Sequence, residues 1–158
     1  RPGDRIPADG QITSGASGID ESPVTNAVIT YDKTWIDYDV TEGGKRGMRI
    51  HVKFIVENMK GVDSYLRIRV ARKVGSKDDF LKTTNISFSN NDGELTVSKK
   101  LKPGFDKAFY NDEKIFLPYD QIIIGSGEHN LSLDLDIVTP DDDLVKHMGW
   151  YDFIFRRQ

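Results

Sequence analysis

Acidic residues near the C-terminal end of the chain are the first group whose types and spacing could do chemistry. Several oxygen ligands close to the end of a strand suit Ca²⁺, which prefers carboxylate and carbonyl oxygens. No Asp-x-Asp-x-Asp-Gly loop accompanies them, and acidic loops are often only solvated, so both interpretations stay open. The candidate ligands are Asp134, Asp136, Asp141, Asp142 and Asp143.

A second group is basic and occupies alternate positions of two expected strands. Arg49, His51 and Lys53 lie in the first strand, and Arg67 and Arg69 lie in the second. If these strands pair, the five side chains share one face, which could bind an acidic partner or a phosphate-rich surface. The alternative is that the basic side chains are solvated and protect the sheet from edge-to-edge association.

Aromatic side chains in the region 105–119 form a further candidate binding surface, because Tyr and Phe are enriched at interfaces. Phe105, Phe109, Tyr110 and Tyr119 belong to this group. The candidate binding residues are therefore Arg49, Lys53, Arg67, Arg69, Tyr110 and Tyr119.

Other catalytic patterns do not occur in the sequence. The chain has no Cys, which excludes disulfides, thiolate zinc sites and Cys nucleophiles. No Gly-x-Ser-x-Gly elbow or phosphate-binding Gly-rich loop is present, and the three His residues are scattered. We expect no cofactor and no catalytic residue.

The first 25 residues combine turn formers with short apolar positions. Pro2-Gly3-Asp4 and Ala8-Asp9-Gly10 favour turns, and Ile6, Ile12 and Ile19 suit short strands. This pattern predicts a β-hairpin that needs a neighbouring sheet, because it has too few apolar residues to fold alone.

The same segment closely resembles the actuator domain of heavy-metal-transporting P-type ATPases, with its signature P-G-D-x-I-P-x-D-G followed by D-E-S-x-x-T-G-E-S. The resemblance covers residues 1–25 only and implies a metal-transport ATPase and a cytoplasmic location. The matching positions are Pro2, Gly3, Asp4, Ile6, Pro7, Asp9, Gly10, Asp20, Glu21, Ser22 and Thr25.

The resemblance ends before the catalytic group of that family. There the Glu of Thr-Gly-Glu positions the water that hydrolyses an aspartyl phosphate, whereas this chain reads Thr25-Asn26-Ala27. Ala27 has no carboxylate to orient water, so the motif is degenerate. Glu42 is the nearest downstream candidate to replace it, if the fold brings Glu42 to this turn. The family's phosphorylation motif begins like Asp32-Lys33-Thr34, but that match is short and wrongly spaced.

Charge and hydropathy restrict the remaining function classes. The chain has 158 residues, with 22 basic and 25 acidic residues and a net charge of −3, which argues against general nucleic-acid binding. No apolar stretch approaches the roughly 20 residues that a membrane helix needs. The chain begins with Arg1 rather than Met, and we expect it to be part of a longer protein that could carry a membrane segment.

Alternation of apolar and polar residues dominates the rest of the chain and predicts strands. The clearest runs are 48–56, 65–74, 113–117, 130–138 and 150–155, with a hairpin around Asn90-Asn-Asp-Gly93 joining Ile86–Phe88 to 94–97. Asn58-Met-Lys-Gly61 predicts a turn between the first two strands, and Asp141–Met148 suits one helical turn.

These patterns predict an all-β protein, a β-sandwich of about seven or eight mostly antiparallel strands over residues 28–158, preceded by the actuator-like hairpin segment 1–27. The runs Gly47–Phe54, Leu101–Phe105 and Tyr110–Tyr119 also resemble an uncharacterised bacterial β-sandwich accessory module, and this resemblance covers roughly residues 35–155. We therefore expect a non-catalytic interaction module with a protein partner. The alternatives are a degenerate actuator-type domain of a metal pump and a calcium-dependent C2-like domain.

Overall fold

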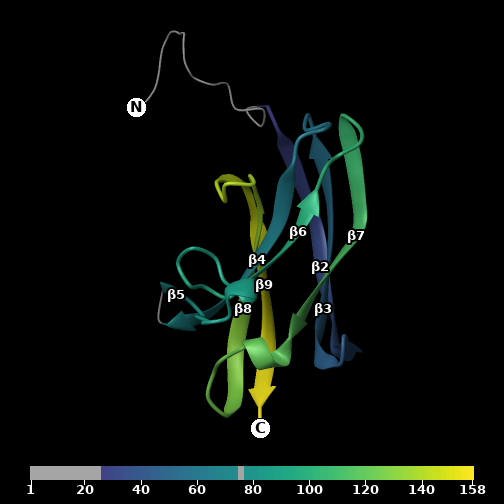
Figure 1. The fold of residues 1–158 in the computed structure, drawn as a ribbon. Coiled ribbons are helices and arrows are strands. Elements are labelled where there is room, and N and C mark those ends of the chain that lie inside the picture. Colours follow the sequence, from purple (N-terminus) through teal and green to yellow (C-terminus); the bar gives the residue numbers. More distant parts are fainter. Residues whose placement is uncertain (1–25, 75–76) are drawn as a thin grey trace.

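The computed structural model describes residues 26–74 and 77–158. The predicted hairpin segment falls in residues 1–25 and lies outside the described residues. All eight strands of the described part belong to two antiparallel sheets that pack face to face (Figure 1). The predicted all-β sandwich is confirmed.

The first sheet has three strands in the order β2-β3-β7. They are β2 (Val28–Glu42), β3 (Lys45–Glu57) and β7 (Lys107–Pro118). Buried and outward-facing side chains alternate along β3 as predicted. Met48, Ile50 and Val52 are completely buried, while Arg49 and Lys53 point outward.

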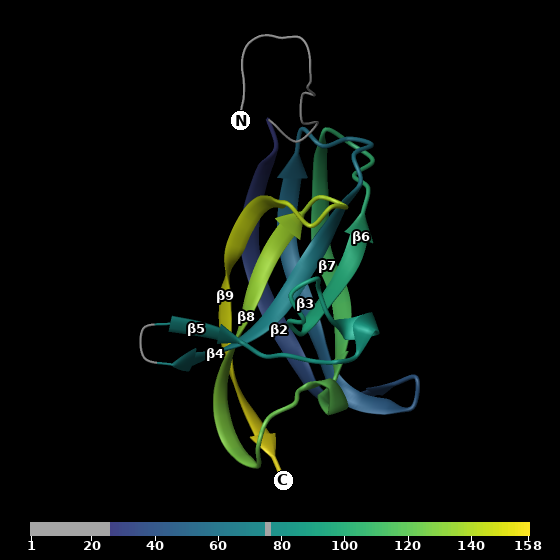
Figure 2. The same ribbon diagram turned by 60° about the vertical axis from the view of Figure 1, so that its left-hand side comes forward.

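The second sheet has five strands, with β4 paired to β8 on one side and to both β5 and β6 on the other. The strands are β4 (Ser64–Val74), β5 (Lys77–Phe80), β6 (Thr96–Leu101), β8 (Gly127–Val138) and β9 (Leu144–Arg157). The β4–β5 hairpin projects sideways from the body (Figure 2).

The core fills the space between the sheets. Its fully buried side chains come mainly from β3, β4 and β8, each of which presents one apolar face inward. Among them are Phe54, Met48, Ile50, Leu66, Ile68, Leu131, Leu133 and Leu135.

Strand pairing differs from the expectation at one important place. The segment Asn58–Gly61 does not join a hairpin, because β3 and β4 belong to different sheets. Both strands have a strongly apolar face, and these faces bury more surface when they oppose each other across the core than when they lie side by side. The basic residues therefore do not share one face, and that prediction is wrong.

Two local predictions are also wrong. Ile86–Phe88 is a 3₁₀ turn, η1, with its Asn85 cap accepting from the backbone N–H of Ser87, so the expected strand is absent. The turn at Asn90–Gly93 does form, and Ser89 makes an isolated bridge to Leu95 beyond it. Residues 144–148 extend as part of β9 instead of forming a helical turn.

Candidate functional site

A network of opposite charges covers the outer face of the five-stranded sheet. Strand register places Arg67 of β4 opposite Asp136 of β8, and Arg69 opposite Asp134. Such directly opposed, oppositely charged pairs stabilise neighbouring strands. The sequence-based candidates Arg67, Arg69, Asp134 and Asp136 therefore come together, although as partners of one another.

The hydrogen bonds in this network are short and well formed. Arg67 Nη2 donates to Asp136 Oδ2 at 2.7 Å, and Arg69 donates to Asp134 Oδ2 from Nε at 2.9 Å and from Nη2 at 2.5 Å. Arg69 Nη1 also donates to Glu94 Oε1 at 3.0 Å. Asp134 and Asp136 are only 2% and 1% exposed, so these are buried ion pairs.

His147 of β9 closes the network from the other side. Its Nδ1 lies 2.7 Å from Asp136 Oδ1 and 2.9 Å from Asp134 Oδ1. The Phe80 ring covers the Arg69 guanidinium at 4.0 Å, and Trp150 stacks beside Phe80. Aromatic rings thus shield these charges from water and strengthen their interactions.

The two aspartates have pKa values that shift in opposite directions. Burial, together with the adjacent Asp136 carboxylate, raises the pKa of Asp134 to about 6. Burial also opposes the charge of Asp136, but hydrogen bonds with Asp134 and Arg67 outweigh it and lower the pKa of Asp136. The neighbouring carboxylates share one proton more readily than they carry two negative charges.

The predicted calcium ligands divide into two groups in the structure. Asp134, Asp136 and His147 offer ligand atoms within 4.8 Å of one another, which is a spacing that a metal ion could bridge. However, all four carboxylate oxygens of the aspartate pair already face an Arg or His nitrogen. A Ca²⁺ ion would have to displace these side chains.

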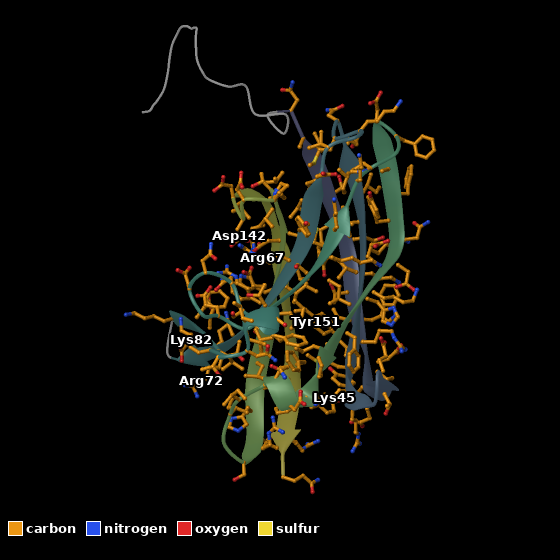
Figure 3. The ribbon with its side chains drawn as sticks, in the orientation of Figure 1. Lys45, Arg67, Arg72, Lys82, Asp142 and Tyr151 are labelled. Atoms are coloured by element: carbon orange, nitrogen blue, oxygen red, sulfur yellow. The ribbon has the colours of Figure 1, made fainter. Side chains whose placement is uncertain are left out.

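The remaining acidic candidates lie in the turn between β8 and β9. Asp142 lies beside Arg67 (Figure 3) and accepts from its Nη1 at 3.0 Å. Asp141, Asp142 and Asp143 are all exposed residues. Asp142 has a φ of 68°, a left-handed conformation that Asp tolerates better than most residues. The turn thus positions one carboxylate over the sheet and leaves its neighbours in solvent.

Beside this network lies a cavity of about 430 Å³, which the sequence did not reveal. Its base is the outer face of the sheet at Tyr65, Arg67 and Ser98, which register places on neighbouring strands. The segment 89–91 and the turn 138–142 form the rest of its lining. The size falls within the range of ligand-binding pockets, roughly 300–1,000 Å³.

Arg67 connects the charge network to the cavity. Two of its nitrogens donate to Asp136 and Asp142, and its side chain is only 9% exposed. Its Nε is buried and finds no acceptor among the described residues. A buried donor without a partner costs about 1–3 kcal/mol, so Arg67 is held in place by its two carboxylate partners at some cost to its third donor.

The other basic candidates lie on the opposite sheet in separate ion pairs. Arg49 contacts Glu42 at 2.8 Å, and Lys53 lies 3.4 Å from Asp32. Between them His51 is buried, with Asp112 and Asp37 oxygens at 2.6 Å and 2.8 Å from its ring nitrogens. These contacts leave no continuous basic surface on this face.

The aromatic candidates do not form one surface either. Tyr110 points inward and stacks on Phe54 at a centroid distance of 5.0 Å, while Phe109 points outward and is 61% exposed. Tyr119 lies beyond the other end of β7, in the 3₁₀ turn η2 (Tyr119–Gln121), and donates to Asp39 at 3.1 Å. Tyr110 and Tyr119 thus contact other residues of the protein in two separate places, instead of forming one binding surface.

The degenerate actuator motif extends into the described residues only at Asn26 and Ala27. These precede β2, whereas Glu42 ends it, so a strand of 15 residues separates them. At about 3.3 Å per residue the separation is roughly 45 Å. Glu42 bonds to Arg49 at the far end of the molecule and does not replace the missing glutamate.

Comparisons of the chain with protein-family models, with curated proteins and with solved structures found no match. In the described part of the chain, no helix is long and apolar enough to cross a membrane.

Proposed function

We propose that residues 26–158 form a non-catalytic binding module whose ligand or partner occupies the cavity formed by β4, β6 and the β8–β9 turn. The observation that carries this proposal is the fixed Arg67, held by two carboxylates at the base of an open, polar cavity. A side chain that is already held rigidly, as Arg67 is, favours binding because little side-chain entropy is lost when a ligand arrives.

The electrostatics favour binding over catalysis. The carboxylate with the raised pKa, Asp134, is 2% exposed and lies beneath Arg69, so a substrate has no route to its oxygens. A general acid or base must come within hydrogen-bond reach of the reacting atom. The perturbed pKa values are therefore better explained by a structural ion-pair network.

A thermal-shift screen tests the proposal. The wild-type chain is screened against neutral saccharides, amino acids and short peptides, inorganic phosphate and polyamines. A ligand that binds the folded state raises the melting temperature by mass action. We expect at least one class to give a concentration-dependent rise.

A cavity-filling variant shows whether the cavity is responsible. Ser98 is exposed on β6 opposite Arg67, so Ser98→Trp should fill the cavity and abolish the rise in melting temperature. Ser126→Trp, the same change in an exposed segment outside the cavity, should leave the rise intact. No response from any ligand class, or an equal response in Ser98→Trp, would contradict the proposal.

The actuator-type alternative has its own requirement. It needs a carboxylate at the turn after Thr25, and neither Asn26 nor Ala27 supplies one. The actuator-type function is therefore the second candidate, and no residue in the described part of the chain is proposed as its catalytic group.

A further inference from the structure

The chemistry of the cavity lining indicates what it would bind. One aromatic ring, from Tyr65, lies among hydroxyls from Ser89 and Ser98, the amide of Asn91 and the carboxylate of Asp141. Asn90, also in the lining, is different, because its side chain bonds to Glu94 and to the backbone of its own turn. Asn90 therefore shapes the wall, and its neighbour Asn91 is available to a ligand.

Hydroxyl and amide groups both donate and accept hydrogen bonds. They match a ligand that carries hydroxyl groups, since either partner can donate at each contact. An apolar ligand would leave Ser98 and Asn91 without partners, at a cost of about 1–3 kcal/mol for each buried group. The lining therefore selects for a polar ligand.

The charges of the cavity argue against an anion. Arg67 already donates to Asp136 and Asp142, so its positive charge is compensated within the protein. Asp141 adds an exposed carboxylate at the rim. An anionic ligand would face these carboxylates without an uncompensated cation, whereas a neutral hydroxyl can donate to a carboxylate.

We propose that the cavity binds a neutral, polyhydroxylated ligand of the saccharide class, and this inference rests on the binding function proposed above. A sugar ring packs its apolar face against the partly buried Tyr65 ring, and its hydroxyls bond to Asn91, Ser98 and Asp141.

Isothermal titration calorimetry tests this inference. Neutral hexoses, N-acetylhexosamines and their disaccharides are titrated into the wild-type chain, with inorganic phosphate and spermidine as charged comparison probes. We expect a saccharide to bind and inorganic phosphate, an anion that would face these carboxylates, to bind more weakly. Tyr65→Ala and Asn91→Ala should each weaken saccharide binding by about tenfold or more, as expected for residues at the centre of a contact.

Asn111→Ala is the matched control, because Asn111 is exposed on β7 of the other sheet and should leave the affinity unchanged. A ¹⁵N-HSQC spectrum of each variant confirms that it remains folded. If spermidine or phosphate binds with sensitivity to Asn91→Ala and no saccharide does, the saccharide inference is overturned while the binding function stands. If no probe of any class binds, in this assay or in the thermal-shift screen, both proposals fail.

Discussion

Asp134 and Asp136 are two residues apart on one strand, and their different contacts shift their pKa values in opposite directions. The pKa of Asp134 lies at about 6, above its ordinary value of 3.8, because burial and the second carboxylate disfavour its charge. The unfolded chain therefore releases this proton at lower pH than the folded chain does. The stabilisation from the protonated Asp134 is complete below about pH 4 and is lost as the pH rises through about 6.

Asp134→Asn should remove this pH dependence, because the new side chain resembles the protonated carboxyl and cannot ionise. The difference in free energy of unfolding between the variant and wild type should therefore rise, in favour of the variant, by about 1–2 kcal/mol from pH 5 to pH 7.5. Urea denaturation at several pH values measures this difference. A difference that stays constant with pH would show that Asp134 does not titrate in this range.

The Arg67 side chain provides a second test at the scale of one residue. Replacing it with Met leaves Asp136 buried without its main counter-ion, which costs about 3–5 kcal/mol for buried pairs. Arg72→Met is the matched control, since Arg72 and Asp79 are each about half exposed and their pair contributes roughly 0–1 kcal/mol. Equal losses in urea denaturation would refute the buried network.

At the scale of the strands, β3 and β7 leave no room for a side chain at Gly47. Gly47 stands opposite Pro118, and a Cβ there would lie 2.3 Å from the carbonyl oxygen of Leu117. Backbone atoms cannot move away as a flexible side chain could. This position therefore requires glycine for space, with no need for a positive φ.

Gly47→Ala should lower the free energy of unfolding by about 3 kcal/mol, the upper part of the range for overpacked sites. Gly125→Ala serves as its control, because nothing lies within 4 Å of a Cβ at that position. Chemical denaturation of both variants gives the comparison. A neutral Gly47→Ala would mean that β3 and β7 are farther apart than described.

Some strands could be predicted from the sequence and others could not. The runs in β3, β4 and β8 alternate clearly because each has one face in the core. β2 was missed, since bulges between Tyr31 and Lys33 and between Asp37 and Val40 break its period of two. Pairing was less predictable than strand content, because alternation shows which face is buried without showing which strand lies beside it.

The candidate site shows the same limit. Their residue types made Arg67, Arg69 and the acidic residues Asp134 and Asp136 candidates for ligand binding. Residue type alone could not show that these charges pair with one another. That outcome depends on the register of β4 against β8. Tyr65 and Ser98 occupy outward positions of their strands, so alternation could have suggested them, whereas the walls of the cavity come from a turn and a loop segment.

At the scale of the whole molecule, the length of β2 separates Asn26 and Ala27 from Glu42. The cavity and its charge network lie on the outer face of the five-stranded sheet, and Glu42 lies at the far end of the other sheet. We therefore expect the purified chain to leave the rate of acetyl phosphate hydrolysis unchanged. A protein-dependent acceleration in a phosphate-release assay would revive the actuator-type function.

If this molecule binds its ligand at the cavity over β4 and β6, the residues that line this cavity should respond when the ligand is added. Chemical-shift mapping by ¹⁵N-HSQC, with the strongest binder from the thermal-shift screen, measures this response residue by residue. We expect the largest shifts on Tyr65, Ser98 and residues 89–91 and 138–142. Shifts centred instead on the outer face of the three-stranded sheet, around Trp35 and His51, would contradict it.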